Sequence, residues 1–303
     1  MNDIQKKDVV IGLIKGYDFE ILRPFVMTLK KTGYAGDVVF FHAQTDKGTL
    51  EKLKDLGVIL IPFDEKFPYG ADAGGHERWS GERMKNLGIY CLRYLLAYRY
   101  LAANENKYKR VMLSDTRDVI FQKDPFDFSV HPLCCFIEHE GSEIQDSPVN
   151  AEWIRTGFGP EEFEHLRHKP IICSGITIGS TQGILRYLEI FLDTIVNKDV
   201  PAHLRGMDQG IHNYLIHEGK VESSLYKNNE GPVFTLGLED DVRLKGGYIH
   251  NANGGIPNVV HQYDRHWRLA WHYWSLRLIL RDYYSLWRAR FRRIFGISKK
   301  QHA

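Results

Sequence analysis

Residues 111–125 read Val-Met-Leu-Ser-Asp-Thr-Arg-Asp-Val-Ile-Phe-Gln-Lys-Asp-Pro, which is an apolar run, two close-set acids and a second apolar run. The run Val111–Leu113 predicts a buried strand that delivers Asp115 and Asp118 at its end, and Val119–Phe121 predicts another strand. Carboxylates at the end of a buried strand are costly unless a positive group lies beside them. Proteins hold Mg²⁺ and Mn²⁺ with one or two carboxylates plus substrate phosphates. The stretch therefore predicts a metal–diphosphate site at the carboxyl end of a central strand.

The same acids admit a structural interpretation. Asp115 can cap a turn, and Arg117 can pair with Asp118 at the surface. The rest of the chain favours the metal interpretation.

The segments before this stretch alternate between strand and helix patterns. We expect strands at Val9–Ile14, Asp37–His42 and Val58–Pro62, and helices at Ile21–Lys31 and Thr49–Leu56. A polar, glycine-rich loop from Asp64 to Gly81 and a long helix from Glu82 to Ala103 follow. This order predicts an α/β fold with a mostly parallel, doubly wound sheet, in which ligands bind beyond the carboxyl ends of the strands.

The second half of the chain is less regular. Ile171–Gly179 predicts a strand that is kinked at Ser174–Gly175, and Leu185–Asn197 predicts a helix. Another helix opens at 206–210 and runs to His217. Later strands are expected at Val233–Leu236 and Asn258–Tyr263.

Composition places the chain among globular proteins. Its 303 residues are 43% apolar and 13% aromatic, which is enough to bury a sizeable core. The four cysteines form no Cys-x-x-Cys pair, so a reduced, cytoplasmic compartment is expected. The apolar run Val9–Ile14 is too short for a signal peptide or a membrane span.

The C-terminal segment differs from the rest in charge. Residues 265–303 hold ten Lys or Arg residues and one acid, Asp282, so this tail carries +9 and the remaining chain −7. The tail is also rich in Trp and Tyr, which predicts a basic amphipathic helix at an anionic membrane surface. A helix packed on the main domain is the alternative, and no nucleic-acid partner is expected. We therefore divide the chain into a domain at 1–264 and a tail at 265–303.

Four motifs, in this order, resemble glycosyltransferases of the GT-A fold, which use nucleotide-sugar donors. The resemblance covers Val9 to His266. Asp115-Thr-Arg-Asp118 is similar to their Asp-x-Asp element with one residue more. Residues 173–179 resemble the Asn-Ser-Gly strand of family 8-like members, and residues 207–210 resemble their Asp-Gln segment. Residues 259–262 resemble the late segment whose histidine completes the metal shell. The Lys-Pro-Trp that follows this histidine in family 8 is absent, which indicates another branch of the fold.

The resemblance implies roles for individual residues. Asp115, Asp118 and His261 would hold Mn²⁺ or Mg²⁺. Because the two acids are one residue further apart than in the family, it stays open whether Asp115 contacts the ion directly. Asp208 and Gln209 would face the transferred sugar as the catalytic pair, and the Asp-Gln resemblance favours a retaining reaction. An inverting enzyme would instead use Asp208, Glu161, Glu162 or Asp241 as base. The residues expected to bind the donor are Lys15, Tyr17, Arg93, Asp115, Ser174 and Gly175.

The expected function is therefore a metal-dependent transfer of a sugar to an acceptor hydroxyl. The basic tail favours a glycan or lipid-linked glycan acceptor at the membrane, as in surface polysaccharide or glycolipid biosynthesis, with the enzyme cytoplasmic and peripherally membrane-associated. A sugar-1-phosphate nucleotidyltransferase is an alternative, but residues 12–17 supply its glycine-rich basic loop poorly. A non-catalytic glycan- or membrane-binding module is a third possibility.

Overall fold

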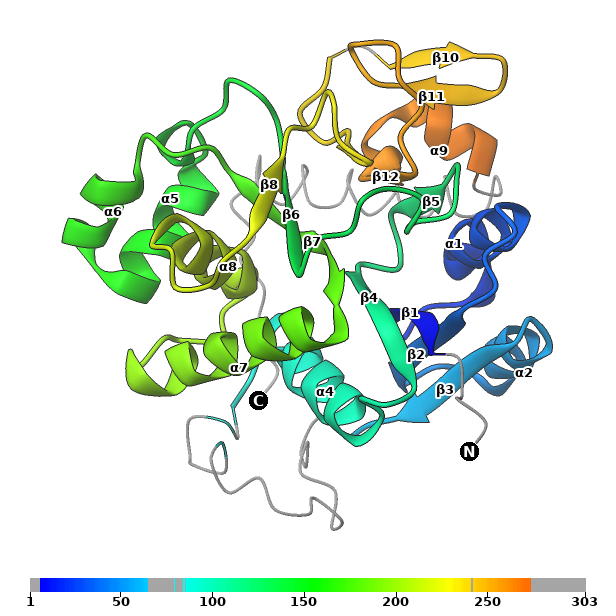
Figure 1. Cartoon of the computed structure of the whole chain (residues 1–303), viewed down its shortest axis with the longest axis horizontal. Helices are drawn as coiled ribbons and strands as arrows, with labels where there is room; N and C mark the ends of the chain where they lie inside the picture. The colour runs from blue at the N-terminus through cyan, green and yellow to red at the C-terminus, as the bar shows by residue number, and fades with distance from the viewer. Residues whose placement is uncertain (1–5, 65–78, 80–83, 85, 241, 274–303) are drawn as a thin grey trace, which may run out of the picture.

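A seven-stranded sheet forms the centre of the computed structural model, which describes residues 6–64, 79, 84, 86–240 and 242–273 (Figure 1). Its strands are β1 (Lys7–Lys15), β2 (Asp37–Ala43), β3 (Val58–Pro62), β4 (Tyr108–Ser114), β6 (Leu133–Ile137), β7 (Ile172–Ser180) and β8 (Ser224–Tyr226). They lie in the order β3-β2-β1-β4-β7-β6-β8, and β7 alone runs against the others. The predicted α/β class with a mostly parallel sheet is confirmed, as are the first three predicted strands.

Helices cover both faces of this sheet. They are α1 (Phe19–Lys31), α2 (Lys47–Asp55), α4 (Ile89–Ala103), α5 (Pro148–Phe158), α6 (Pro160–Leu166), α7 (Thr181–Asn197) and α8 (Met207–His217), with the short 3-10 turn η2 (Ile144–Asp146). The 3-10 turn η3 (Tyr263–Arg265) and helix α9 (Trp267–Tyr273) pack together in a separate apolar cluster. Successive strand residues point to opposite faces. In β1, Val9 and Ile11 therefore pack with α4 and α7, whereas Val10 and Ile14 pack with α1 and α2. Both faces are buried, as a mostly parallel sheet requires.

Capping side chains start several helices earlier than the apolar pattern predicts. The Asp18 carboxylate accepts a hydrogen bond from the Ile21 amide (3.2 Å) and starts α1 at Phe19. Ser180 accepts one from the Gly183 amide (3.1 Å), so α7 begins four residues before the predicted Leu185. Apolar periodicity marks the buried face of a helix, whereas these polar N-caps set its first turn.

The long helix before β4 is shorter than predicted. The expected start at Glu82 lies outside the described residues, and the described helix, α4, begins only at Ile89. Gly88 precedes it in an extended conformation and donates its amide hydrogen to the Ala202 carbonyl (3.0 Å). A Cβ at Gly88 would lie 2.7 Å from the His203 carbonyl oxygen, so glycine is needed for this close backbone approach at the residue before α4 begins.

A second, three-stranded sheet lies beyond the carboxyl end of β4. It consists of β5 (Val119–Phe121), β12 (Val259–His261) and β9 (Val233–Thr235), in that order. The hairpin β10 (Arg243–Lys245) and β11 (Tyr248–His250) lies beside α9 in Figure 1. Because β12 is antiparallel to β5, the register sets His261 opposite Val119. This pairing brings the late histidine next to the acids that precede β5.

The predicted kink in β7 coincides with a change of register. Cys134 of β6 pairs with Ile178, but Phe136 pairs with Cys173, so residues 174–177 lie opposite Cys135 alone. Bulges of this kind redirect side chains and often lie beside functional sites. Here the bulge holds Ser174 and Gly175.

The predicted tail lies mostly outside the described residues, since only α9 and the residues just before it are described. The division of the chain at residue 264 therefore stays a prediction, as does most of the loop from Asp64 to Gly81. Within the described part of the chain, no helix combines the length and the apolar character that crossing a membrane requires. The four cysteines are buried free thiols.

Candidate functional site

The strand order creates a crevice between β1 and β4. The chain winds outward from β1 through β2 to β3 and then resumes with β4 on the other side of β1. Open α/β sheets bind ligands at such a reversal, beyond the carboxyl ends of the strands. Lys15 ends β1 here, and Asp115 directly follows β4.

A cavity of about 360 Å³ opens at this point, which we call the switch-point cavity. The charged residues that line it are Lys15, Arg93, Arg117, Arg205, Arg265, Asp115 and Asp118. Tyr17 and Tyr90 add aromatic surface to its wall. Its volume is within the range of small-ligand sites, and its excess of cations suits an anionic ligand. Of the predicted residues, Lys15, Tyr17, Arg93, Asp115 and Asp118 line this cavity directly.

The loop from 115 to 118 is fixed to both neighbouring strands. The Asp115 amide donates a hydrogen bond to the Gly175 carbonyl (2.7 Å), and the Thr116 hydroxyl donates one to the Leu13 carbonyl (3.0 Å). Gly12 leaves the room for this packing, because a Cβ there would lie 2.3 Å from Cγ2 of Thr116. The acids are therefore held in place by backbone and packing contacts before any ligand binds.

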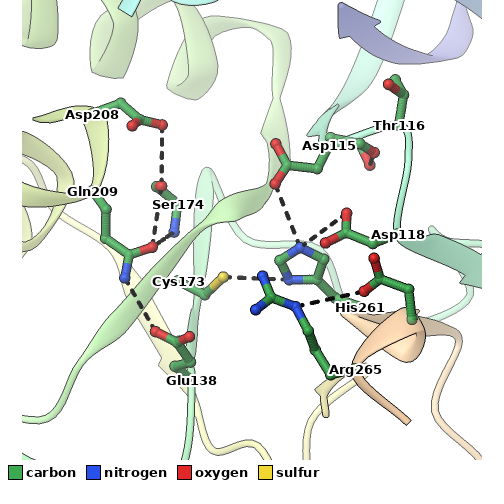
Figure 2. A network of polar contacts seen from close by, with 12 residues as sticks. Asp115, Thr116, Asp118, Glu138, Cys173, Ser174, Asp208, Gln209, His261 and Arg265 are labelled. Atoms are coloured by element: carbon green, nitrogen blue, oxygen red, sulfur yellow. Dashed lines mark hydrogen bonds and ion pairs between the residues drawn. The ribbon is translucent and has the colours of Figure 1, made fainter. Parts of the chain in front are cut away.

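Asp115, Asp118 and His261 converge at the edge of the cavity (Figure 2). Nε2 of His261 lies 3.5 Å from a carboxylate oxygen of Asp115 and 3.7 Å from one of Asp118. One potential ligand atom from each residue lies within 4.8 Å of the other two. The Gln262 amide, next to His261, donates to the Asp118 carbonyl (2.7 Å), which fixes the two segments to each other.

The three side chains have the features of a metal site. His261 is only 2% exposed, and its Nε2 is buried without a hydrogen-bond partner. A buried polar atom without a partner is costly, and a cation between the carboxylates would satisfy it. Gly175 keeps this space open, because a Cβ there would lie 2.4 Å from Cε1 and 2.8 Å from Nε2 of His261. Two carboxylates and an imidazole suit Mn²⁺ among the hard divalent ions.

The pKa values of the two acids diverge. Burial would raise the pKa of Asp115, but Arg93 and His261 outweigh it and lower that pKa to about 2. Burial raises the pKa of Asp118 to about 6; His261 opposes this shift and Asp115 adds to it. Strongly shifted pKa values cluster at functional sites, and a bound divalent cation would favour the ionised form of both acids.

Arg93 links this group to the predicted catalytic segment. It reaches inward from α4 and forms an ion pair with Asp115 and another with Asp208 (2.7 Å). It also donates to the Ser174 carbonyl (3.0 Å). Asp208 is 3% exposed and accepts a hydrogen bond from the Ser174 hydroxyl (3.3 Å). Burial raises the pKa of Asp208, and Arg93 opposes this shift.

Gln209 belongs to the same network but its amide is used by protein partners. Its oxygen accepts from the amide and hydroxyl groups of Ser174 (3.4 Å each). Its nitrogen donates to Glu138 (3.1 Å) and to Asn150 (3.0 Å). Figure 2 shows Asp208 and Gln209 together on one side of Ser174, across the site from Asp118. The structure thus brings the predicted residues Ser174, Asp208 and Gln209 together.

Sequence reasoning missed several residues of this site. Arg117 and Arg205 line the cavity from two separate loops, Arg265 lines it from η3, and Glu138 accepts a hydrogen bond from Gln209. Arg117 pairs with Asp264 (3.3 Å), a partner that the sequence did not predict. A charged residue in a loop carries no periodic signal, so only the fold reveals which of the arginines converge.

Comparison with known proteins assigns no family. A scan of protein-family models gives no match, and a search of curated proteins gives none either.

Proposed function

We propose that this chain is a divalent-metal-dependent glycosyltransferase that moves a sugar from a nucleoside-diphosphate donor to an acceptor hydroxyl. One observation carries the proposal. The switch-point cavity combines several basic side chains with an Asp-Asp-His group whose buried imidazole nitrogen Nε2 has no hydrogen-bond partner. A diphosphate ligand needs cations along its length and a divalent metal at its charge centre, and this cavity offers sites for both.

The metal would be held by Asp115, Asp118 and His261. The extra residue between the acids does not separate them, because both carboxylates lie near the same imidazole nitrogen. A bound ion would act as a Lewis acid for the diphosphate leaving group. The imidazole ligand favours Mn²⁺ over Mg²⁺, which prefers an all-oxygen shell.

The cations of the cavity would bind and orient the diphosphate. Arg117, Arg205 and Arg265 lie around the cavity, and arginine binds phosphate oxygens through two parallel hydrogen bonds. Lys15 and Tyr17, at the end of β1, would contact the nucleoside. The Arg93 guanidinium, held by two carboxylates, would stay fixed behind the metal site.

Ser174, Asp208 and Gln209 would form the wall next to the transferred sugar. Asp208 already accepts hydrogen bonds from Arg93 and Ser174, so a role in orienting hydroxyl groups agrees with its contacts better than that of a mobile base. This assignment keeps the expected preference for a retaining reaction. The sheet order, with its reversal at the cavity, is compatible with the GT-A resemblance, as it is with other doubly wound folds.

The acceptor is proposed to be a glycan or lipid-linked glycan at a membrane surface, as in surface polysaccharide or glycolipid biosynthesis. Within the described start of the tail, Trp267 is 68% exposed and Trp271 is 53% exposed. They lie four residues apart and so share one face of α9, next to Arg268. Exposed tryptophans beside a cation suit the boundary between lipid headgroups and water. A peripheral position on the cytoplasmic side is part of the same proposal.

A sugar-1-phosphate nucleotidyltransferase stays the second candidate. It would also use the metal and the cations, but it would release pyrophosphate from a nucleoside triphosphate. The products of the reaction separate the two candidates. A binding module without catalysis would give no product from either substrate.

The test is a product assay with a panel of nucleotide sugars and Mn²⁺. We expect free nucleoside diphosphate and sugar, formed by slow transfer to water, from at least one donor. Asp118→Asn should abolish this release, because it removes a carboxylate from the metal site. Asp124→Asn is a matched control, since Asp124 caps the Phe126 amide (2.8 Å) outside the cavity. Turnover of nucleoside triphosphate with sugar-1-phosphate, and not of nucleotide sugar, would contradict the proposal.

A further inference from the structure

His261 has two ring nitrogens with different surroundings. Nε2 faces the carboxylates of Asp115 and Asp118, whereas Nδ1 lies 3.4 Å from Sγ of Cys173 (Figure 2). Both side chains of this Cys–His pair are 2% exposed. Water therefore does not compete for the contact between Nδ1 and the thiol.

We propose that Cys173 is a positioning residue for the candidate metal centre: its thiol holds His261 by Nδ1 and so presents Nε2 to the ion. This inference rests on the metal site of the proposed function. A histidine that binds a metal through Nε2 carries its proton on Nδ1, and that proton needs an acceptor. The sulfur of Cys173 is the acceptor that the described structure supplies.

The thiol suits this task because it can both donate and accept a hydrogen bond. When Nδ1 carries the proton, it donates to Sγ and leaves the lone pair of Nε2 directed at the carboxylates. When Nε2 carries the proton, the S–H group donates to Nδ1 instead. Cys173 can therefore serve as the hydrogen-bond partner of Nδ1 in either tautomer of His261.

The strand geometry fixes the thiol in this place. Cys173 lies in β7 at the start of the register change, where it pairs with Phe136. Two residues further on, Gly175 leaves the space into which the imidazole fits. The bulged segment of β7 thus supplies both a hydrogen-bond partner and the room for the ring, while Asp115 and Asp118 supply the opposing charge.

The test measures binding of Mn²⁺ alone, from the free Mn²⁺ signal in electron paramagnetic resonance. Cys173→Val keeps an apolar side chain of similar size but can neither donate nor accept a hydrogen bond. Removing the partner of a metal-binding histidine typically weakens metal affinity about 10- to 100-fold. We expect this loss in Cys173→Val and tighter binding in Cys173→Ser than in Cys173→Val. Cys135→Ala, which alters another buried thiol in the sheet, should bind as the wild type does.

A second readout reports the tautomer directly. In the wild-type protein saturated with Zn²⁺, a diamagnetic ion that imidazole binds well, ¹⁵N NMR of the imidazole should show the proton of His261 on Nδ1. His261→Gln identifies the signals. A proton on Nε2 under these conditions would overturn the inference, even if Cys173→Val failed to fold.

The outcomes separate this inference from the proposed function. If His261→Ala weakens Mn²⁺ binding but Cys173→Val binds like the wild type, the positioning role of Cys173 is overturned and the metal site stands. Equal affinities for Cys173→Ser and Cys173→Val would also overturn it. If the wild type and His261→Ala bind Mn²⁺ equally, the metal centre is wrong and the inference is wrong with it.

Discussion

Gly175→Ala is the smallest change that should disable the candidate metal site. The new Cβ would lie 2.4 Å from Cε1 of His261 and 2.9 Å from a carboxylate oxygen of Asp115, whereas ordinary contacts begin at 3.4 Å. The imidazole would therefore have to retreat by about 1 Å, the difference between these contacts. Distances between metals and their ligands tolerate only about 0.2 Å. We expect Mn²⁺ affinity to fall at least about tenfold, as it does when a ligand loses its support.

The assay is calorimetric titration of Mn²⁺ into the purified protein, with thermal unfolding measured in parallel. Gly175 lies in a β-strand, so alanine fits its backbone and the fold should persist. Gly48→Ala is the matched control. The atom nearest to its new Cβ would be a carboxylate oxygen of Asp46 at 3.3 Å, and neither Gly48 nor Asp46 belongs to the candidate metal site. Wild-type Mn²⁺ affinity in a folded Gly175→Ala variant would refute the placement of the metal.

Three further perturbations test separate parts of the account. Arg265→Gln should weaken binding of a nucleoside diphosphate and make this binding less dependent on salt, while binding of Mn²⁺ alone stays unchanged. Equal salt dependence in the wild type and the variant would contradict the role of the Arg265 side chain. Burial lowers the pKa of His212 to about 3, so below the unfolded pKa of 6.5 the unfolded chain takes up a proton that the folded chain does not. This group should therefore lower the free energy of unfolding by about 2 kcal/mol between pH 7 and pH 5. In His212→Asn the free energy of unfolding should fall less over the same range, and an equal fall in both proteins would contradict the role of His212. The full-length protein should sediment with anionic liposomes at low salt and be released at high salt. Each basic residue near such a surface contributes about 1 kcal/mol to the binding free energy. If the protein does not sediment at low salt, the membrane proposal is wrong.

The main sheet could be predicted because its strands are short apolar runs between turns. Val9–Ile14 is apolar and mostly buried, and Val58–Pro62 is apolar although this edge strand is only partly buried. No competing pattern obscures either run. The helix starts were harder, because polar caps such as Asp18 and Ser180 decide them rather than the apolar face. At Gly88, the residue before α4, the backbone amide donates a hydrogen bond to the Ala202 carbonyl, and no local pattern carries that information.

The apolar pattern predicted the acids that follow a strand, and the resemblance supplied Ser174, Asp208 and Gln209, which the structure brings together. Asp115 and Asp118 stand at the end of an apolar run, and the resemblance supplied His261. That these three meet depends on the pairing of β5 with β12, which joins segments about 140 residues apart in the chain. Arg205 and the thiol of Cys173 gave no signal, because their roles come from what the fold places beside them.

The most direct test is calorimetry with nucleotide sugars on the wild type and on Asp118→Ala, each with and without Mn²⁺. The account predicts that the wild type binds at least one nucleotide sugar tightly only with Mn²⁺, and that Asp118→Ala loses this metal-dependent gain while it stays folded. Binding that is equally tight without the metal, or unchanged in Asp118→Ala, would contradict a metal–diphosphate site at the end of β4.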